Sequence, residues 1–119
     1  MLNWGWSGSP TPAEEKALAL LQDNLTRVQR RQFRKNSKFR VRGSHTGRWY
    51  VIKPGRFQNV YMLGDDDETV VTGLCFSPQG LDYAGDIMLG QKIALENYED
   101  EVLKVANEFL AAPFGESWA

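Results

Sequence analysis

The N-terminal third of the chain carries apolar residues at helical spacing. Leucines recur there at intervals of three and four residues, which predicts an amphipathic helix. Thr11 can cap this helix, and Glu14 stands where the carboxylate of a capping box is found. Thr26 can cap a second helix, in which Val28 and Phe33 are the apolar residues expected to be buried.

From Phe39 onward the period of the apolar residues falls to two, which is typical of half-buried strands. Four segments share this pattern: "FRVRG", "RWYVI", "FQNVYML" and "TVVTGLCF". The polar stretches "GSHTG" and "GDDDE" are predicted to be turns. Short links of this kind favour an antiparallel meander, since parallel pairing needs long crossovers. The inner face of the sheet is expected to carry Tyr50, Ile52, Val60 and Met62.

Helical spacing returns near the C-terminus. Asp82 is a candidate N-cap for a third helix, and Asn97 is expected to interrupt it. A fourth helix is predicted from Tyr98 to Leu110, with Glu99 in its first turn, where a carboxylate suits the positive end of the helix dipole.

These elements predict an α+β fold of one domain. The expected architecture is a four-stranded antiparallel β-meander flanked by N-terminal and C-terminal helix pairs packed on one face. The domain is expected to span residues 11–110, between an irregular Trp-bearing segment at 1–10 and an irregular tail at 111–119.

The formal net charge of −1 conceals a strong asymmetry along the 119 residues. Residues 1–60 carry twelve Lys and Arg against three Asp and Glu, a net charge of +9. Residues 61–119 carry two basic residues against twelve acidic ones, a net charge of −10. Either the two halves neutralise each other in one fold or between subunits, or the basic half faces a polyanion.

Candidate catalytic or metal-binding residues do not form a recognisable motif. His45 is the only histidine and lies in a predicted turn, without a nucleophile at a suitable spacing. Cys75 is the only cysteine and is expected to be a buried apolar residue. The acidic run 65–68 lacks the spacing of a calcium-binding loop. We therefore expect no catalytic residues, no cofactor and no metal, and we expect the protein not to be an enzyme.

An ordered set of motifs between Ala17 and Phe109 resembles a widespread family of short, uncharacterised bacterial and phage-type proteins. The matching stretches are "LTRVQRRQF", "FRVRGSHTGRWYVI", "NVYML", "GDIMLGQKIALE" and "VANEF". The family has no established activity, so the resemblance implies no catalytic residues. It implies a phage, prophage or mobile-element setting, and its members commonly carry another residue where His45 stands.

Two functional hypotheses follow. The first is a non-enzymatic interaction module that binds a protein partner or a second copy through aromatic residues of the termini. These residues are Trp4, Trp6, Phe114 and Trp118. In a phage-type setting, such a module would be an accessory or virion-associated protein. The alternative is nucleic-acid binding through the basic segment 27–56. Its candidate residues are Arg30, Arg31, Arg34, Lys35, Arg40 and Arg42.

The expected location is the cytoplasm of the host cell or a virion. The first ten residues lack the basic and apolar regions of a secretory signal. No apolar run reaches the roughly 18 residues that a membrane-spanning helix needs, so we expect no membrane partner.

Overall fold

The computed structural model describes residues 11–110. In this range the chain forms three helices and five strands. In chain order they are α1 (Pro12–Asp23), α2 (Arg27–Asn36), β1 (Phe39–Arg42), β2 (Trp49–Ile52), β3 (Val60–Leu63), β4 (Val70–Cys75), α3 (Ala84–Val105) and β5 (Asn107–Phe109).

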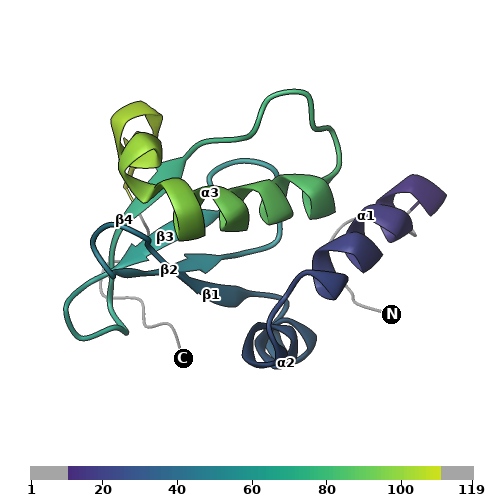
Figure 1. Ribbon diagram of the computed structural model, residues 1–119, viewed down its shortest axis with the longest axis horizontal. Coiled ribbons are helices and arrows are strands. Elements are labelled where there is room, and N and C mark those ends of the chain that lie inside the picture. Colours follow the sequence, from purple (N-terminus) through teal and green to yellow (C-terminus); the bar gives the residue numbers. More distant parts are fainter. Residues whose placement is uncertain (1–10, 111–119) are drawn as a thin grey trace.

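The strands form one antiparallel sheet with the order β1-β2-β3-β4-β5. The first four strands confirm the predicted meander. Helix α3 packs across β1 and β2, α1 packs on α3, and α2 lies beside the edge strand β1 (Figure 1). The chain is therefore α+β, with its long helix on one face of the sheet.

The capping residues explain where the first two helices begin. Thr11 accepts a hydrogen bond from the backbone N–H of Glu14 while the Glu14 carboxylate accepts one from Thr11, which is the predicted capping box. Thr26 and Gln29 form a second capping box at the start of α2. Helix α2 ends at Asn36, and its C-cap residue Ser37 has a left-handed φ of 59°.

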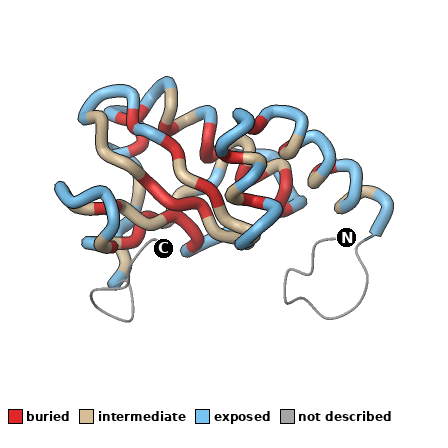
Figure 2. Tube along the Cα trace, turned by 90° about the horizontal axis from the view of Figure 1, so that it is seen from below, coloured by how far each residue is buried: buried red, intermediate tan, exposed pale blue. Residues whose placement is uncertain are grey.

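The main core lies between the sheet and the helices. Phe33 of α2 and Phe39 of β1 meet edge to face, with ring centroids 6.0 Å apart. Tyr50, Ile52 and Val60 are fully buried there, as the period of two predicts. Figure 2 shows the buried residues concentrated in the strands and the exposed residues along the outer helices.

Val28 corrects one expectation. It is 58% exposed, whereas Phe33 is fully buried. The two residues lie five positions apart, so at 100° per residue they point to different sides of the helix.

The C-terminal part agrees with its prediction in the break between two helical segments but not in the N-cap. The two segments are joined within α3 at a kink at Tyr98, whose backbone is not helical (φ −139°, ψ 41°). Helix α3 begins after Tyr83, which makes no side-chain capping bond, so Asp82 is not the N-cap.

The predicted helix to Leu110 is also wrong, because α3 ends at Val105 and the next residues form β5. Phe109 pairs with Gly73 of β4, and its ring lies over that glycine. The ring also packs edge to face on Tyr61, with centroids 5.6 Å apart. These contacts with the sheet outweigh the local helical pattern.

None of the three helices in residues 11–110 combines the length and the apolar composition that a membrane-spanning helix needs.

Candidate functional site

Helix α2 gathers five basic residues on one side. They stand at positions i, i+3, i+4, i+7 and i+8, which at 100° per residue confines them to an arc of about 140°. These residues are Arg27, Arg30, Arg31, Arg34 and Lys35. Together they line a shallow hollow of about 460 Å³. We call this surface the α2 basic face.

The opposite side of α2 explains why the basic residues point outward. Gln29 and Phe33 are buried there. The amide nitrogen of Gln29 donates to the backbone oxygen of Arg40 (2.9 Å), and Gln32 accepts a bond from the backbone N–H of Arg40 (3.0 Å). Helix α2 thereby satisfies the outer edge of β1, which a sheet would otherwise leave unpaired.

Arg30 fixes α2 against the end of α1. Its guanidinium donates to the backbone oxygens of Gln22 (3.1 Å) and Leu25 (3.3 Å). The Gln22 carbonyl belongs to the last turn of α1 and the Leu25 carbonyl follows it, and a positive charge is favourable at this end of a helix. Arg30 therefore has a structural role besides contributing charge to the α2 basic face.

The charges of the α2 basic face are not neutralised within residues 11–110. No side-chain hydrogen bond or ion pair joins Arg27, Arg31, Arg34 or Lys35 to another residue of this range. All four residues are exposed. The surface is therefore an uncompensated concentration of positive charge on one helix.

Arg40 and Arg42 lie elsewhere, on the sheet face opposite the main core. Both guanidinium groups stack on the ring of Trp49, at 4.4 and 5.5 Å from its centroid. Arg42 also donates to the backbone oxygen of Gly47 (3.2 Å). The structure therefore divides the six predicted basic residues into four on α2 and two on this sheet face.

The aromatic residues proposed to contact a partner, Trp4, Trp6, Phe114 and Trp118, lie outside the described residues. Near the C-terminal segment, Val105 is 72% exposed and Leu110 is 73% exposed. Apolar surface is thus present near the C-terminal end of the described residues.

The turn "GSHTG" encloses a buried carboxylate from α3. Glu99 accepts hydrogen bonds from the backbone N–H groups of His45 (2.8 Å) and Thr46 (2.6 Å), and from the hydroxyls of Thr46 and Tyr50 (both 2.5 Å). The backbone N–H of Glu99 donates to Ser44 (3.1 Å). A Cβ atom on Gly43 would lie 2.3 Å from the Glu99 carboxyl carbon, so the approach requires glycine there.

This network changes the acidity of both of its titratable members. Burial acts to raise the pKa of Glu99, but the bonds from Thr46, Tyr50 and His45 outweigh it and leave that pKa below its ordinary value. Burial, followed by the bond to Glu99, raises the pKa of Tyr50 well above its ordinary value. Glu99 is therefore a charged acceptor, and its partners are donors that hold the turn against α3.

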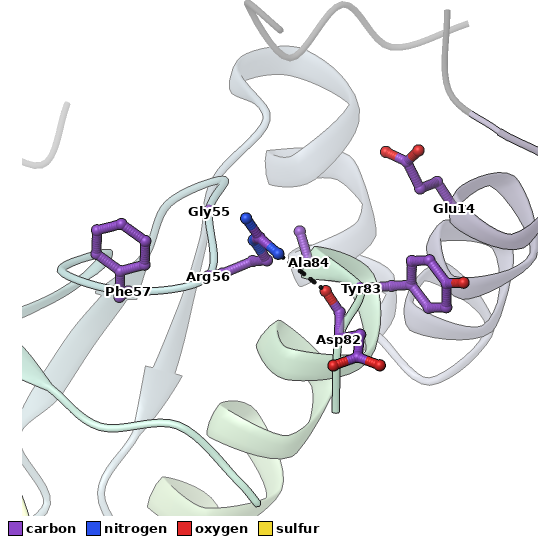
Figure 3. A pocket seen from close by; sticks show the side chains of 7 residues that line it. All are labelled: Glu14, Gly55, Arg56, Phe57, Asp82, Tyr83 and Ala84. Atoms are coloured by element: carbon purple, nitrogen blue, oxygen red, sulfur yellow. Dashed lines mark hydrogen bonds between the residues drawn. The ribbon is translucent and has the colours of Figure 1, made fainter. Parts of the chain in front are cut away.

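A second hollow lies between the start of α1 and the loops before β3 and α3 (Figure 3). It has a volume of about 610 Å³. Its lining includes two aromatic residues, Phe57 and Tyr83, and two carboxylates, Glu14 and Asp82. Arg56 also lines this hollow, and its guanidinium donates to the backbone oxygen of Asp82 (3.4 Å). Two carboxylates against one arginine make this hollow unsuited to phosphate.

The residues considered for catalysis or metal binding are dispersed. Within residues 11–110 no three His, Cys, Asp or Glu side chains are grouped so that they could hold a metal ion. His45 is exposed, and Cys75 is a partly buried free thiol. Asp66 accepts bonds from Thr69, which lower the pKa of its carboxyl to about 2, so it stabilises its own turn.

Comparisons of the chain with protein-family models, with curated proteins and with solved structures found no match. The resemblance to short phage-type proteins therefore stays a prediction.

Two parts of this arrangement were missed from the sequence. Arg27 belongs to the α2 basic face, and the same three- and four-residue spacing that groups Arg31 with Lys35 could have included it. Glu99 was assigned to a helix dipole, and no local pattern indicates the partners of its carboxylate, which lie 49 to 54 residues away.

Proposed function

We propose that this protein binds nucleic acid through phosphate contacts made by the α2 basic face. The observation that carries the proposal is the set of five basic side chains on one arc of one helix. Four of these side chains have no partner in the described part of the chain. Arginine and lysine neutralise phosphates and release bound counterions, which supplies most of the affinity of such interfaces.

The overall charge of −1 does not conflict with this proposal. Electrostatic attraction between exposed charges falls off over about 8–10 Å at moderate salt, so a polyanion responds to the local surface. Much of the acidic charge lies on the β3–β4 turn and around the α3 kink. The α2 basic face can therefore attract phosphates although the chain as a whole is weakly acidic.

The test compares two double variants with the same change in charge. Arg31→Gln with Lys35→Gln removes two positive charges from the α2 basic face. Lys16→Gln with Lys104→Gln removes two exposed charges from α1 and α3. We expect the first pair to weaken binding to a fluorescent DNA oligonucleotide at low salt by roughly tenfold, and the second to change it little.

Equal weakening by both pairs would show that only net charge matters and would contradict a site on α2. Circular dichroism of both variants checks that the fold is retained, which is expected because all four side chains are exposed.

A second candidate function is the binding of a protein partner or a second copy through Trp4, Trp6, Phe114 and Trp118. The exposed apolar residues Val105 and Leu110, which precede the C-terminal segment in the sequence, favour it. An accessory or virion-associated role in a phage-type setting belongs to this candidate.

Its test uses the full chain with Phe114→Ala and Trp118→Ala, and separately with Trp4→Ala and Trp6→Ala. If the partner is a second copy, at least one of these double variants should lose self-association. Light scattering after size-exclusion chromatography measures this loss. Tyr98→Ala, which removes an aromatic residue that is 60% exposed at the α3 kink, is the control. A wild-type monomer at all concentrations would contradict self-association.

A further inference from the structure

We infer, on the basis of the proposed function, that the ligand is duplex DNA and that α2 lies in its major groove. The inference deepens nucleic-acid binding to one class of ligand. It rests on the dimensions of the α2 basic face, on the absence of stacking residues within it, and on how α2 is held by the rest of the fold.

The dimensions of the α2 basic face match a groove. From Arg27 to Lys35 the helix rises about 12 Å, at 1.5 Å per residue. Arg30 and Lys35 lie at the two margins of the arc, so their side chains diverge toward opposite sides. A helix about 10–12 Å across fits a major groove that is about 12 Å wide. Such a helix can contact the phosphates of both strands.

Among residues 11–110, the hollow on α2 offers no ring on which an unpaired base could stack. Its described lining residues are arginine and lysine, and Phe33, the aromatic residue of this helix, is fully buried. Proteins that bind single strands combine basic grooves with exposed aromatic platforms. The α2 basic face has only the first of these features, which favours a ligand whose bases are already paired.

The aromatic residues on the sheet do not supply such a platform beside α2. Trp49 is stacked by Arg40 and Arg42, and Tyr61 is contacted by Lys53 and by Phe109. These rings are already in contact with side chains of the protein.

The exposed rings of Phe57 and Tyr83 do not provide a stacking platform for single-stranded nucleic acid either. They line the hollow that also contains the carboxylates of Glu14 and Asp82, which repel phosphate. Within residues 11–110, neither the sheet nor this hollow combines an open ring with an uncompensated basic surface.

The attachment of α2 leaves its basic face accessible. Three residues, 24–26, separate α1 from α2, and Figure 1 shows α2 at the margin of the molecule with its axis clearly turned from that of α1. In two-helix DNA-binding units the second helix enters the major groove while the first crosses the backbone. Here Arg30 fastens α2 to the end of α1, and Gln29 fastens it to β1.

Val28 is an exposed apolar residue in the first turn of α2, next to the basic arc. Major-groove interfaces use such side chains against the methyl group of thymine, and the first turns of the inserted helix make most base contacts. A-form RNA duplexes have a deep, narrow major groove that side chains cannot read. The same helix is therefore expected to discriminate against duplex RNA.

The experiment measures binding of the full chain to four probes of one sequence at low salt. The first probe is a DNA duplex of about 20 base pairs, which is two helical turns. The other three probes are its two separated strands and the matching RNA duplex. We expect the DNA duplex to bind at least tenfold more tightly than the others. Methyl green, which occupies the major groove, should displace the protein, and the minor-groove ligand netropsin should not.

The outcomes separate this inference from the proposed function. Equal or tighter binding of single strands or of duplex RNA overturns the inference and leaves phosphate binding by α2 in place, as does displacement by netropsin alone. Failure of all four probes to bind contradicts the proposed function itself. Arg31→Gln with Lys35→Gln should weaken whichever probes do bind, and Lys16→Gln with Lys104→Gln is again the control.

Discussion

Glu99 is the residue that gives the turn "GSHTG" its structure. Its carboxylate accepts four hydrogen bonds from residues 45–50, and Gly43 leaves the space it occupies. The turn closes the β1–β2 hairpin, and Glu99 follows the α3 kink. Because bonds to a charged acceptor contribute about 1.5–3 kcal/mol each when fully formed, this contact joins helix and sheet strongly.

The lowered pKa of Glu99 predicts a particular dependence of stability on pH. Since the folded pKa lies below the unfolded one, the contribution is fully present above about pH 4.3 and is lost as the pH falls through the folded pKa. Glu99→Gln should lower the free energy of unfolding at neutral pH by about 2 kcal/mol. The difference between wild type and variant should shrink in acid.

Urea denaturation at neutral pH and near pH 3 measures this difference. Glu101→Gln, which alters an exposed carboxylate on the same helix, is the control. A gap between wild type and Glu99→Gln that stays constant with pH would contradict a charged Glu99 in the folded protein.

At this scale the sequence predicted the turn but not its partner. Glycine, serine and threonine together indicate a turn by their own backbone and side-chain preferences. That this turn binds Glu99 depends on where α3 packs, and such long-range placement leaves no period or spacing in a single sequence. The exposed position of His45, by contrast, follows from the turn itself.

Helix α2 depends on Gln29 more than on any apolar contact except Phe33. One amide group closes the capping box with Thr26, binds the edge of β1 at Arg40, and contacts Glu96 of α3 (3.0 Å). The side of α2 that faces the fold buries only Gln29 and Phe33, and its outer side is basic. The orientation of the helix is therefore fixed by these polar bonds as well as by Phe33. They also fix the direction in which the α2 basic face points.

Gln29→Ala should therefore destabilise the protein by about 2 kcal/mol, because it leaves buried polar groups without partners. Amide hydrogen exchange should increase in α2 and at Arg40 more than in β3 or β4. Gln22→Ala, a nearby glutamine of α1 whose side chain makes no hydrogen bond within residues 11–110, is the control. Uniform exchange across the sheet would contradict a specific anchoring role.

The elements were predictable where local signals decide them. Both capping boxes, the first four strands and their antiparallel order follow from residues close together in the chain. Strand β5 was not predictable in this way, because Phe109 continues a helical stripe in the sequence. In the structure Phe109 pairs with Gly73, and its ring packs over that glycine. Two helices were predicted in place of α3, with an interruption at Asn97, and the kink lies one residue later, at Tyr98.

For the molecule as a whole, the structure addresses the charge asymmetry in part. Arg48 and Asp65 join the basic and acidic halves across 3.8 Å, and both side chains are substantially exposed. The α2 basic face has no such pairing within residues 11–110. Neutralisation within the fold therefore does not account for the charges of α2, and these charges are the basis of the proposed function.

The candidate interface was predictable in composition but not in shape. Four of its five basic residues were identified from their density along the chain. Their gathering on one arc depends on which side of α2 is buried, and Val28 was assigned to the wrong side. Arg40 and Arg42 are near α2 in sequence but point to the sheet face, since alternate residues of a strand face opposite sides.

The central claim is that the α2 basic face binds phosphates, and the salt dependence of DNA binding tests it most directly. The logarithm of the binding constant falls linearly with the logarithm of the salt concentration, with a slope close to the number of phosphates neutralised. We expect Arg31→Gln with Lys35→Gln to reduce that slope by about two, and Lys16→Gln with Lys104→Gln to leave it unchanged. An unchanged slope for the α2 pair would contradict the claim.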